Sequence, residues 1–213
     1  DRVTVLRGGK TIATVDTADA TPRSLAGLMV GREVETVRRR PADRAALSDV
    51  VLACSALRVA GDRGDEAVRG VSLEVRGGEI VAVAGVAGNG QRELAEALTG
   101  MRPPAAGEVR VDGRTLRAGD PRAAIRARVA HVPEDRLGTG VAPSLSIASN
   151  VVLKSYRDPQ MSAGPLLRLG RIRERAVELI QRYAVRASSP SLPARQLSGG
   201  NLQKVVLGRE FHG

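Results

Sequence analysis

Aromatic residues are almost absent from this chain of 213 residues, which contains one Phe, two Tyr and no Trp. Its core therefore has to be built from Val, Leu, Ile and Ala, which suits a buried parallel sheet flanked by helices. The lack of aromatic side chains also removes the platforms on which single-stranded nucleic acids stack. We therefore expect no nucleic-acid partner, although the net charge is +10.

Three further absences limit the class of protein. Cys54 is the only cysteine, so the chain can form no internal disulfide, which fits a reducing compartment. No apolar run has the length of a membrane span, and no signal peptide opens the chain. The first residue is Asp1 rather than Met, and we therefore expect the sequence to be a fragment.

The sequence pattern divides the chain into three segments. Residues 1–34 contain a predicted hairpin followed by a predicted helix that ends at Gly31. Residues 35–49 are charged, include Pro41 and lack apolar periodicity, so they are predicted to form a linker. The remaining residues, 50–213, form a larger predicted domain, and their length is sufficient for one packed core.

A glycine-rich loop near the middle of the chain has the pattern of a phosphate-binding loop. Residues 80–84 form an unbroken apolar run, which predicts a strand buried on both faces, and residues 93–99 are predicted to be helical. A strand, a glycine loop and a helix in this order form the context that such a loop requires. The predicted nucleotide-binding residues are Gly85, Gly88, Asn89, Gly90, Gln91, Arg92 and Glu93.

Two side chains of this loop depart from the pattern. Gln91 stands where a lysine would reach the phosphates, and Arg92 stands where a Ser or Thr would bind Mg²⁺. Loss of one charge-assisted hydrogen bond, worth about 1.5–3 kcal/mol, weakens binding by about one to two orders of magnitude. We therefore expect a loop that binds nucleotide but does not support efficient hydrolysis. The alternative is a plain glycine turn between a strand and a helix.

A polar cluster follows a second predicted strand, residues 129–132. It includes Glu134, at the end of the strand where ligands bind in sheets of this kind. Glu134 is a candidate for sensing a metal ion or a water molecule near the phosphates. A glutamate–arginine pair on a solvated loop is the alternative. The chain then enters a predicted helical insertion that includes an amphipathic helix at residues 171–183.

Leu197-Ser198-Gly199-Gly200-Asn201 stands directly before a predicted helix at residues 202–210. The two glycines leave backbone N–H groups uncovered at the start of the helix, and Ser198 adds a hydroxyl beside them. Such a helix start is suited to binding an anion, and phosphate is the first candidate. A flexible loop with an ordinary helix cap is the alternative.

Taken together, these motifs resemble the ATP-binding cassette (ABC) family of transport ATPases. Leu197 to Asn201, with Gln203 in the same stretch, looks like the signature motif of that family. Residues 85–92 look like a degenerate Walker A loop, and Glu134 stands at the Q-loop position. The resemblance implies an α/β fold of the P-loop NTPase type, incomplete at the C-terminus. It consists of a core sheet, an antiparallel β subdomain and a helical subdomain at about residues 141–197.

A finer resemblance is to the second cassette of fused double-cassette ATPases in bacterial sugar and nucleoside importers. It is carried by Val132-Pro133-Glu134-Asp135-Arg136 together with the signature motif. Residues 1–34 then resemble the end of the first cassette, and residues 50–213 a partial second one. No Walker B glutamate or switch histidine is present, so we expect no catalytic residue and no turnover in the fragment alone.

The resemblance also implies a set of ligands and partners. The ligands are ATP and Mg²⁺, although no metal ligand in this chain can be named. The partners are the first cassette of the same chain, transmembrane permease subunits and, indirectly, a solute-binding lipoprotein, at the cytoplasmic face of the plasma membrane. The alternatives are a non-transport ABC ATPase acting on nucleic acid or ribosomes, and a regulatory nucleotide-binding module without hydrolysis.

Overall fold

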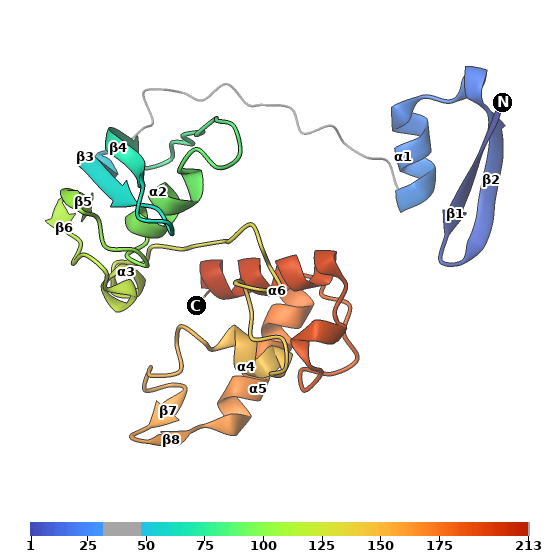
Figure 1. The fold of residues 1–213 in the computed structure, drawn as a ribbon. Helices are drawn as coiled ribbons and strands as arrows, with labels where there is room; N and C mark the ends of the chain where they lie inside the picture. The colour runs from blue at the N-terminus through green and yellow to red at the C-terminus, as the bar shows by residue number, and fades with distance from the viewer. Residues whose placement is uncertain (32–47, 213) are drawn as a thin grey trace. The chain divides into compact units, whose positions relative to one another are not determined.

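The computed structural model describes residues 1–31 and 48–212, which belong to two compact units, Asp1–Ala46 and Leu47–Gly213 (Figure 1). The first unit confirms the predicted hairpin and helix. Strands β1 (Arg2–Arg7) and β2 (Lys10–Asp16) pair in antiparallel fashion. They are followed by the short 3-10 helix η1 (Thr17–Asp19) and by α1 (Pro22–Val30). Most of the predicted linker, residues 35–47, lies outside the described residues.

Helix α1 begins and ends where its sequence requires. Thr21 and Ser24 form a reciprocal capping box, in which each side chain accepts a hydrogen bond from the other residue's backbone N–H. Pro22 occupies the first helical turn, where its missing N–H costs nothing. Gly31 ends the helix in the left-handed conformation with φ 79°.

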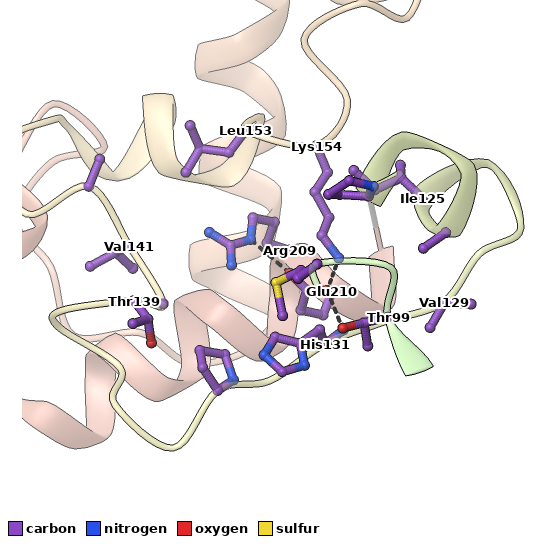
Figure 2. Close-up of a pocket in the computed structure, with 16 residues that line it drawn as sticks. Thr99, Ile125, Val129, His131, Thr139, Val141, Leu153, Lys154, Arg209 and Glu210 are labelled. Carbon is purple, nitrogen blue, oxygen red and sulfur yellow. Dashed lines mark hydrogen bonds and ion pairs between the residues drawn. The ribbon is translucent and has the colours of Figure 1, made fainter. Parts of the chain in front are cut away.

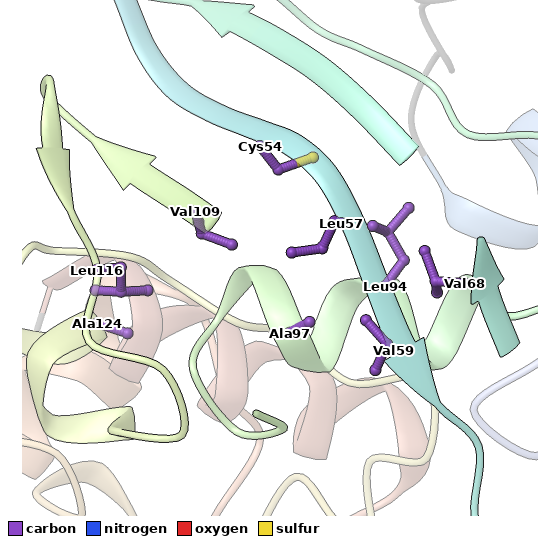
Figure 3. Close-up of a cluster of buried hydrophobic side chains, with 9 residues drawn as sticks. All are labelled: Cys54, Leu57, Val59, Val68, Leu94, Ala97, Val109, Leu116 and Ala124. Carbon is purple, nitrogen blue, oxygen red and sulfur yellow. The ribbon is translucent and has the colours of Figure 1, made fainter. Parts of the chain in front are cut away.

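The first half of the second unit is an antiparallel sheet covered by a helix. The strand order is β4-β3-β5-β6, formed by β3 (Val50–Ala60), β4 (Glu66–Arg76), β5 (Ala106–Val111) and β6 (Arg114–Thr115). Helices α2 (Gln91–Leu98) and α3 (Pro121–Arg126) supply Leu94, Ala97 and Ala124 to its core. Figure 3 shows Leu94 and Ala97 of α2 beside Leu57 and Val59 of β3.

The second half of this unit is helical, as predicted. It contains α4 (Ile147–Val151), a two-stranded ribbon of β7 (Ser162–Ala163) and β8 (Leu166–Leu167), and α5 (Leu169–Arg182). The short η3 (Ala194–Gln196) and α6 (Gly199–His212) complete it. Ile147 and Val151 of α4, Ile172, Ala176 and Leu179 of α5 and Val205 of α6 share one buried cluster.

Two strand predictions were wrong. Residues 80–84 and 129–132 form no strand, and Ile80 is 95% exposed. A strand buried on both faces needs hydrogen-bonding neighbours on each side and side chains covering each face. The described residues pair no strand with either segment, because every paired strand of this unit lies in the antiparallel sheet or in the ribbon. Apolar composition alone therefore did not produce a strand here.

Candidate nucleotide-binding site

The glycine loop is bent into a conformation that only glycine adopts easily. Gly88 and Gly90 have φ values of 90° and 89°. Gly90 is buried, and a Cβ added there would lie 2.3 Å from the carbonyl oxygen of Ala67 on β4. This close approach places the start of α2 directly against the antiparallel sheet. The loop therefore depends on glycine at position 90 for steric as well as conformational reasons.

The start of α2 has the features of an anion site. Gly90 is its N-cap, and no side chain accepts a hydrogen bond from the first turn. A cavity of about 580 Å³ borders this helix start and is lined by Gly85, Gly88, Asn89 and Gly90, together with residues of β4. Uncovered N–H groups beside a cavity can hold phosphate oxygens. The structure thus brings the predicted loop residues together at one helix N-terminus.

Gly90→Ala is expected to destabilise the loop more than Gly88→Ala does. Each substitution places an alanine in the left-handed region, which costs about 1–2 kcal/mol. Only position 90 adds a steric overlap, worth about a further 1–3 kcal/mol, because a Cβ at Gly88 meets nothing within 4 Å. Hydrogen exchange of the α2 amides measures the difference, and equal losses in the two variants would contradict this account of the loop.

The two side chains that depart from the phosphate-loop pattern are both engaged within the protein. The Gln91 Nε2 group donates a 2.9 Å hydrogen bond to the Val86 carbonyl and so closes the loop on itself. Arg92 pairs with Asp62 and with Glu93 at 3.1 Å, and its Nε lies 3.7 Å from Glu96. Arg92 in the place of a hydroxyl cannot ligate Mg²⁺, and the described residues contain no cluster of three His, Cys, Asp or Glu that could hold a metal. The loop therefore lacks the hydroxyl side chain that would ligate Mg²⁺ beside a bound nucleotide.

The signature segment is fixed on one side and open on the other. The Asn201 Nδ2 group donates to Ser198 Oγ at 2.9 Å, and Asn201 Oδ1 accepts from the Arg186 N–H at 2.8 Å. Helix α6 starts at Gly199, three residues before the predicted start, and Gly199 and Gly200 are both exposed. A Cβ at either glycine would meet nothing within 4 Å. Nothing among the described residues therefore requires glycine at these positions.

The remaining residues of the segment anchor it. Leu197 is half-buried and packs against two apolar clusters, which include Leu202 and Val206 of α6. Gln203 is half-buried on the same helix. Asn201, predicted as part of the motif, has a structural task that the sequence did not suggest, since it ties α6 to the chain after α5. Ser198, Gly199 and Gly200 keep an exposed surface.

Sequence reasoning missed Glu210, whose side chain has no exposed surface. Its Oε2 accepts a 2.9 Å hydrogen bond from the His131 N–H and pairs with Lys154, and its Oε1 accepts from Arg209 Nε at 3.0 Å (Figure 2). A cavity of about 370 Å³ lies beside this cluster. Glu210 thereby joins α6 to the segment that precedes Glu134. The sequence did contain one sign of this role, because Glu210 is a carboxylate within the mainly apolar second half of the predicted helix.

The Q-loop candidate is less constrained than this buried neighbour. Glu134 is exposed. The alternative considered above was a pair between Glu134 and a nearby arginine. The ion pairs of the described residues do not include such a pair. His131 contributes its backbone N–H to Glu210, and burial lowers the pKa of its imidazole because desolvation disfavours the charged form. No hydrogen bond or ion pair between described residues joins the glycine loop to the signature segment.

The fold and these two segments define a nucleotide-binding cassette, and comparison with known proteins agrees. A sequence model of the family "ABC transporter" matches residues 68–212, more than half of the chain. The cassette MJ0796, a bacterial ABC transporter cassette, superposes with a TM-score of 0.60 at 22% identity over 75% of this chain and 68% of that one. The cassette cbiO1 from Clostridium perfringens superposes with a TM-score of 0.55 at 20% identity over 76% of this chain and 61% of that one. These two likenesses support the fold.

Curated relatives match at higher identity. The glucose import ATP-binding protein TsgD13 of Haloferax volcanii is 45% identical over 99% of this chain and 38% of its own length. The nucleoside import ATP-binding protein NupA of Lactococcus lactis is 41% identical over 99% of this chain and 41% of its own length. This chain belongs to the ABC transporter family of ATPases, whose members bind nucleotides. It spans about two fifths of the length of these relatives.

Proposed function

We propose that this chain is part of the ATP-binding subunit of an importer for simple sugars or nucleosides. Relatives that match 99% of the chain are named as glucose and nucleoside import ATP-binding proteins, which supports this solute class. No helix among the described residues is long and apolar enough to cross a membrane. Transmembrane permease subunits are proposed as its partners, with a solute-binding lipoprotein acting through them, because the relatives are named as import ATP-binding proteins.

The segment from Ser198 to Gly200 is proposed to bind ATP that another cassette holds. The observation that carries this proposal is the open face of Gly199 and Gly200, where a Cβ would meet no atom of the described residues within 4 Å. Glycines without an internal steric reason are explained by the close approach of a ligand or partner backbone. Ser198 and the uncovered amides at the start of α6 then contact the terminal phosphate.

The glycine loop is proposed as a second, weakened nucleotide site. Its amides and its cavity support phosphate binding, whereas Gln91 and Arg92 replace the groups that would support hydrolysis. At the composite site, residues of the other cassette would hold ATP and Mg²⁺, and the metal would supply neutralisation of the phosphate charge. Efficient turnover is therefore assigned to the site that includes Ser198.

The domain arrangement belongs to the same proposal. Residues 1–34 are the end of a first cassette in the same chain, residues 35–49 are a linker and residues 50–213 are part of a second cassette, with its helical subdomain at about 141–197. The protein then lies peripherally on the cytoplasmic face of the plasma membrane. Glu134 precedes the segment that contacts the permease, and its exposure supports a role at that interface.

A labelling experiment tests the composite site. In the full-length protein assembled with its membrane partners, Ser198→Cys is expected to react with a maleimide more slowly when a non-hydrolysable ATP analogue is bound, because the nucleotide covers the start of α6. Ser191→Cys provides a control, since Ser191 is an exposed serine in the preceding loop. Native Cys54 is buried and contributes little background. Equal protection at positions 198 and 191, or protection at neither, would show that the nucleotide does not meet this segment.

The same subunit acting as a regulatory module is the second candidate function. It is favoured by the engagement of Gln91 and Arg92 within the protein. It requires nucleotide binding without hydrolysis even in the complete assembly, whereas the importer subunit hydrolyses ATP there. ATPase activity of the complete assembly therefore separates the two functions.

A further inference from the structure

The turn between β3 and β4 carries an aspartate that holds two arginines. Asp62 Oδ2 pairs with the Arg92 guanidinium, and Asp62 Oδ1 accepts a 2.7 Å bond from Arg102 Nη2. Both oxygens of one carboxylate are thus occupied by cations. The hydrogen bonds from Arg102 and then Arg92 hold the pKa of Asp62 below its ordinary value, so this carboxylate is ionised at neutral pH.

The two arginines differ in how firmly they are held. The Arg102 side chain is 21% exposed, and it also donates to Glu96 at 2.7 Å and to the Ala60 carbonyl at 3.1 Å. The Arg92 side chain is 59% exposed, and all its ion-pair partners, Asp62, Glu93 and Glu96, are carboxylates. Arg102 therefore serves as an anchor for Asp62, and Arg92 is the more exposed partner.

Arg92 lies in the first turn of α2, directly after Gln91 of the glycine loop. A guanidinium group binds phosphate as readily as carboxylate, through two parallel hydrogen bonds. It is thus the one cation in the loop that could replace the missing lysine. Its guanidinium is already paired with the carboxylate of Asp62, in the turn between β3 and β4. A nucleotide entering the loop has to compete for it with Asp62, and also with Glu93 and Glu96 of α2.

We propose that Asp62 is a specificity-determining residue of the glycine loop, which withholds Arg92 from the phosphates of a bound nucleotide. This inference rests on the proposed role of the loop as a nucleotide site. Asp62 weakens the binding of nucleoside di- and triphosphates and leaves the binding of the uncharged nucleoside unchanged. The loop consequently binds phosphorylated ligands less tightly than it would if only its glycines and the start of α2 determined their binding.

The test compares single and double variants in the full-length protein. Photolabelling with azido-ATP, followed by peptide mapping, reports nucleotide at residues 85–92 separately from any other site. Asp62→Asn is expected to tighten competition by ATP about two- to fivefold, the range of a single exposed ion pair, and to leave competition by adenosine unchanged. In an Arg92→Gln background the same substitution is expected to have no effect.

Asp112→Asn is the matched control. It removes the same charge from an exposed turn of the same sheet, and Asp112 neither pairs with Arg92 nor lines the cavity at the glycine loop. Equal gains from Asp62→Asn and Asp112→Asn, or a gain that persists with Arg92→Gln, would overturn the proposal. If the loop is labelled but Asp62→Asn changes nothing, only this inference fails. If no variant is labelled at the loop, the nucleotide role of the loop fails as well.

Discussion

Ser198→Arg is expected to reduce ATP hydrolysis and solute uptake by the full-length protein about 100-fold or more, the scale seen when one preorganised donor to a reacting anion is lost. Ser198 is exposed and stands at the start of α6 beside two glycines that leave open space. A long arginine side chain fills that space and prevents close approach by a nucleotide held elsewhere. The loss follows from the proposed contact across an interface.

Ser191→Arg is the control for this substitution. It introduces the same side chain at an exposed serine that lies before η3, outside the signature segment. We expect it to leave ATPase activity and uptake near the native level. The fold should survive Ser198→Arg, since the one side-chain hydrogen bond lost, from Asn201, contributes about 1 kcal/mol. Survival of ATPase activity in Ser198→Arg would show that the segment does not meet the nucleotide.

Glu210→Ala is expected to cost about 3–5 kcal/mol of stability, as breaking a buried ion pair does when one partner is left behind. The substitution leaves the Lys154 ammonium, 25% exposed, and the Arg209 guanidinium, 8% exposed, without their carboxylate. It also removes the acceptor of the His131 N–H. Hydrogen exchange of the α6 amides measures the loss in the full-length protein, because it reports local opening.

Glu174→Ala provides the comparison for that measurement. Glu174 pairs with Arg171 on the exposed face of α5, where the two side chains are 62% and 66% exposed. Such a pair contributes at most about 0.5 kcal/mol, because water screens both charges. If Glu210→Ala costs no more than Glu174→Ala, then the buried cluster does not hold α6 against the segment before Glu134.

Local patterns in the sequence were sufficient for the features whose physics is local. The left-handed Gly31, the amphipathic α5 and the helix start after Ser198 each depend on residues within a few positions of one another. The order of the glycine loop and the signature segment was likewise enough to indicate the family that the comparisons show.

Tertiary structure decided the features that depend on distant partners. Residues 80–84 have the composition of a buried strand, but a strand forms only where neighbouring strands satisfy its backbone, and the described residues supply none. The role of Glu210 depends on Lys154, 56 positions away, and that of Asp62 on Arg92, 30 positions away. The sequence alone therefore identified the loop and the signature segment. The partners of Arg92 and Glu210 were decided by the tertiary structure. A hydrogen-bonded ion pair forms only where the fold brings two opposite charges within a few ångströms of each other, and the sequence does not show which charges those are.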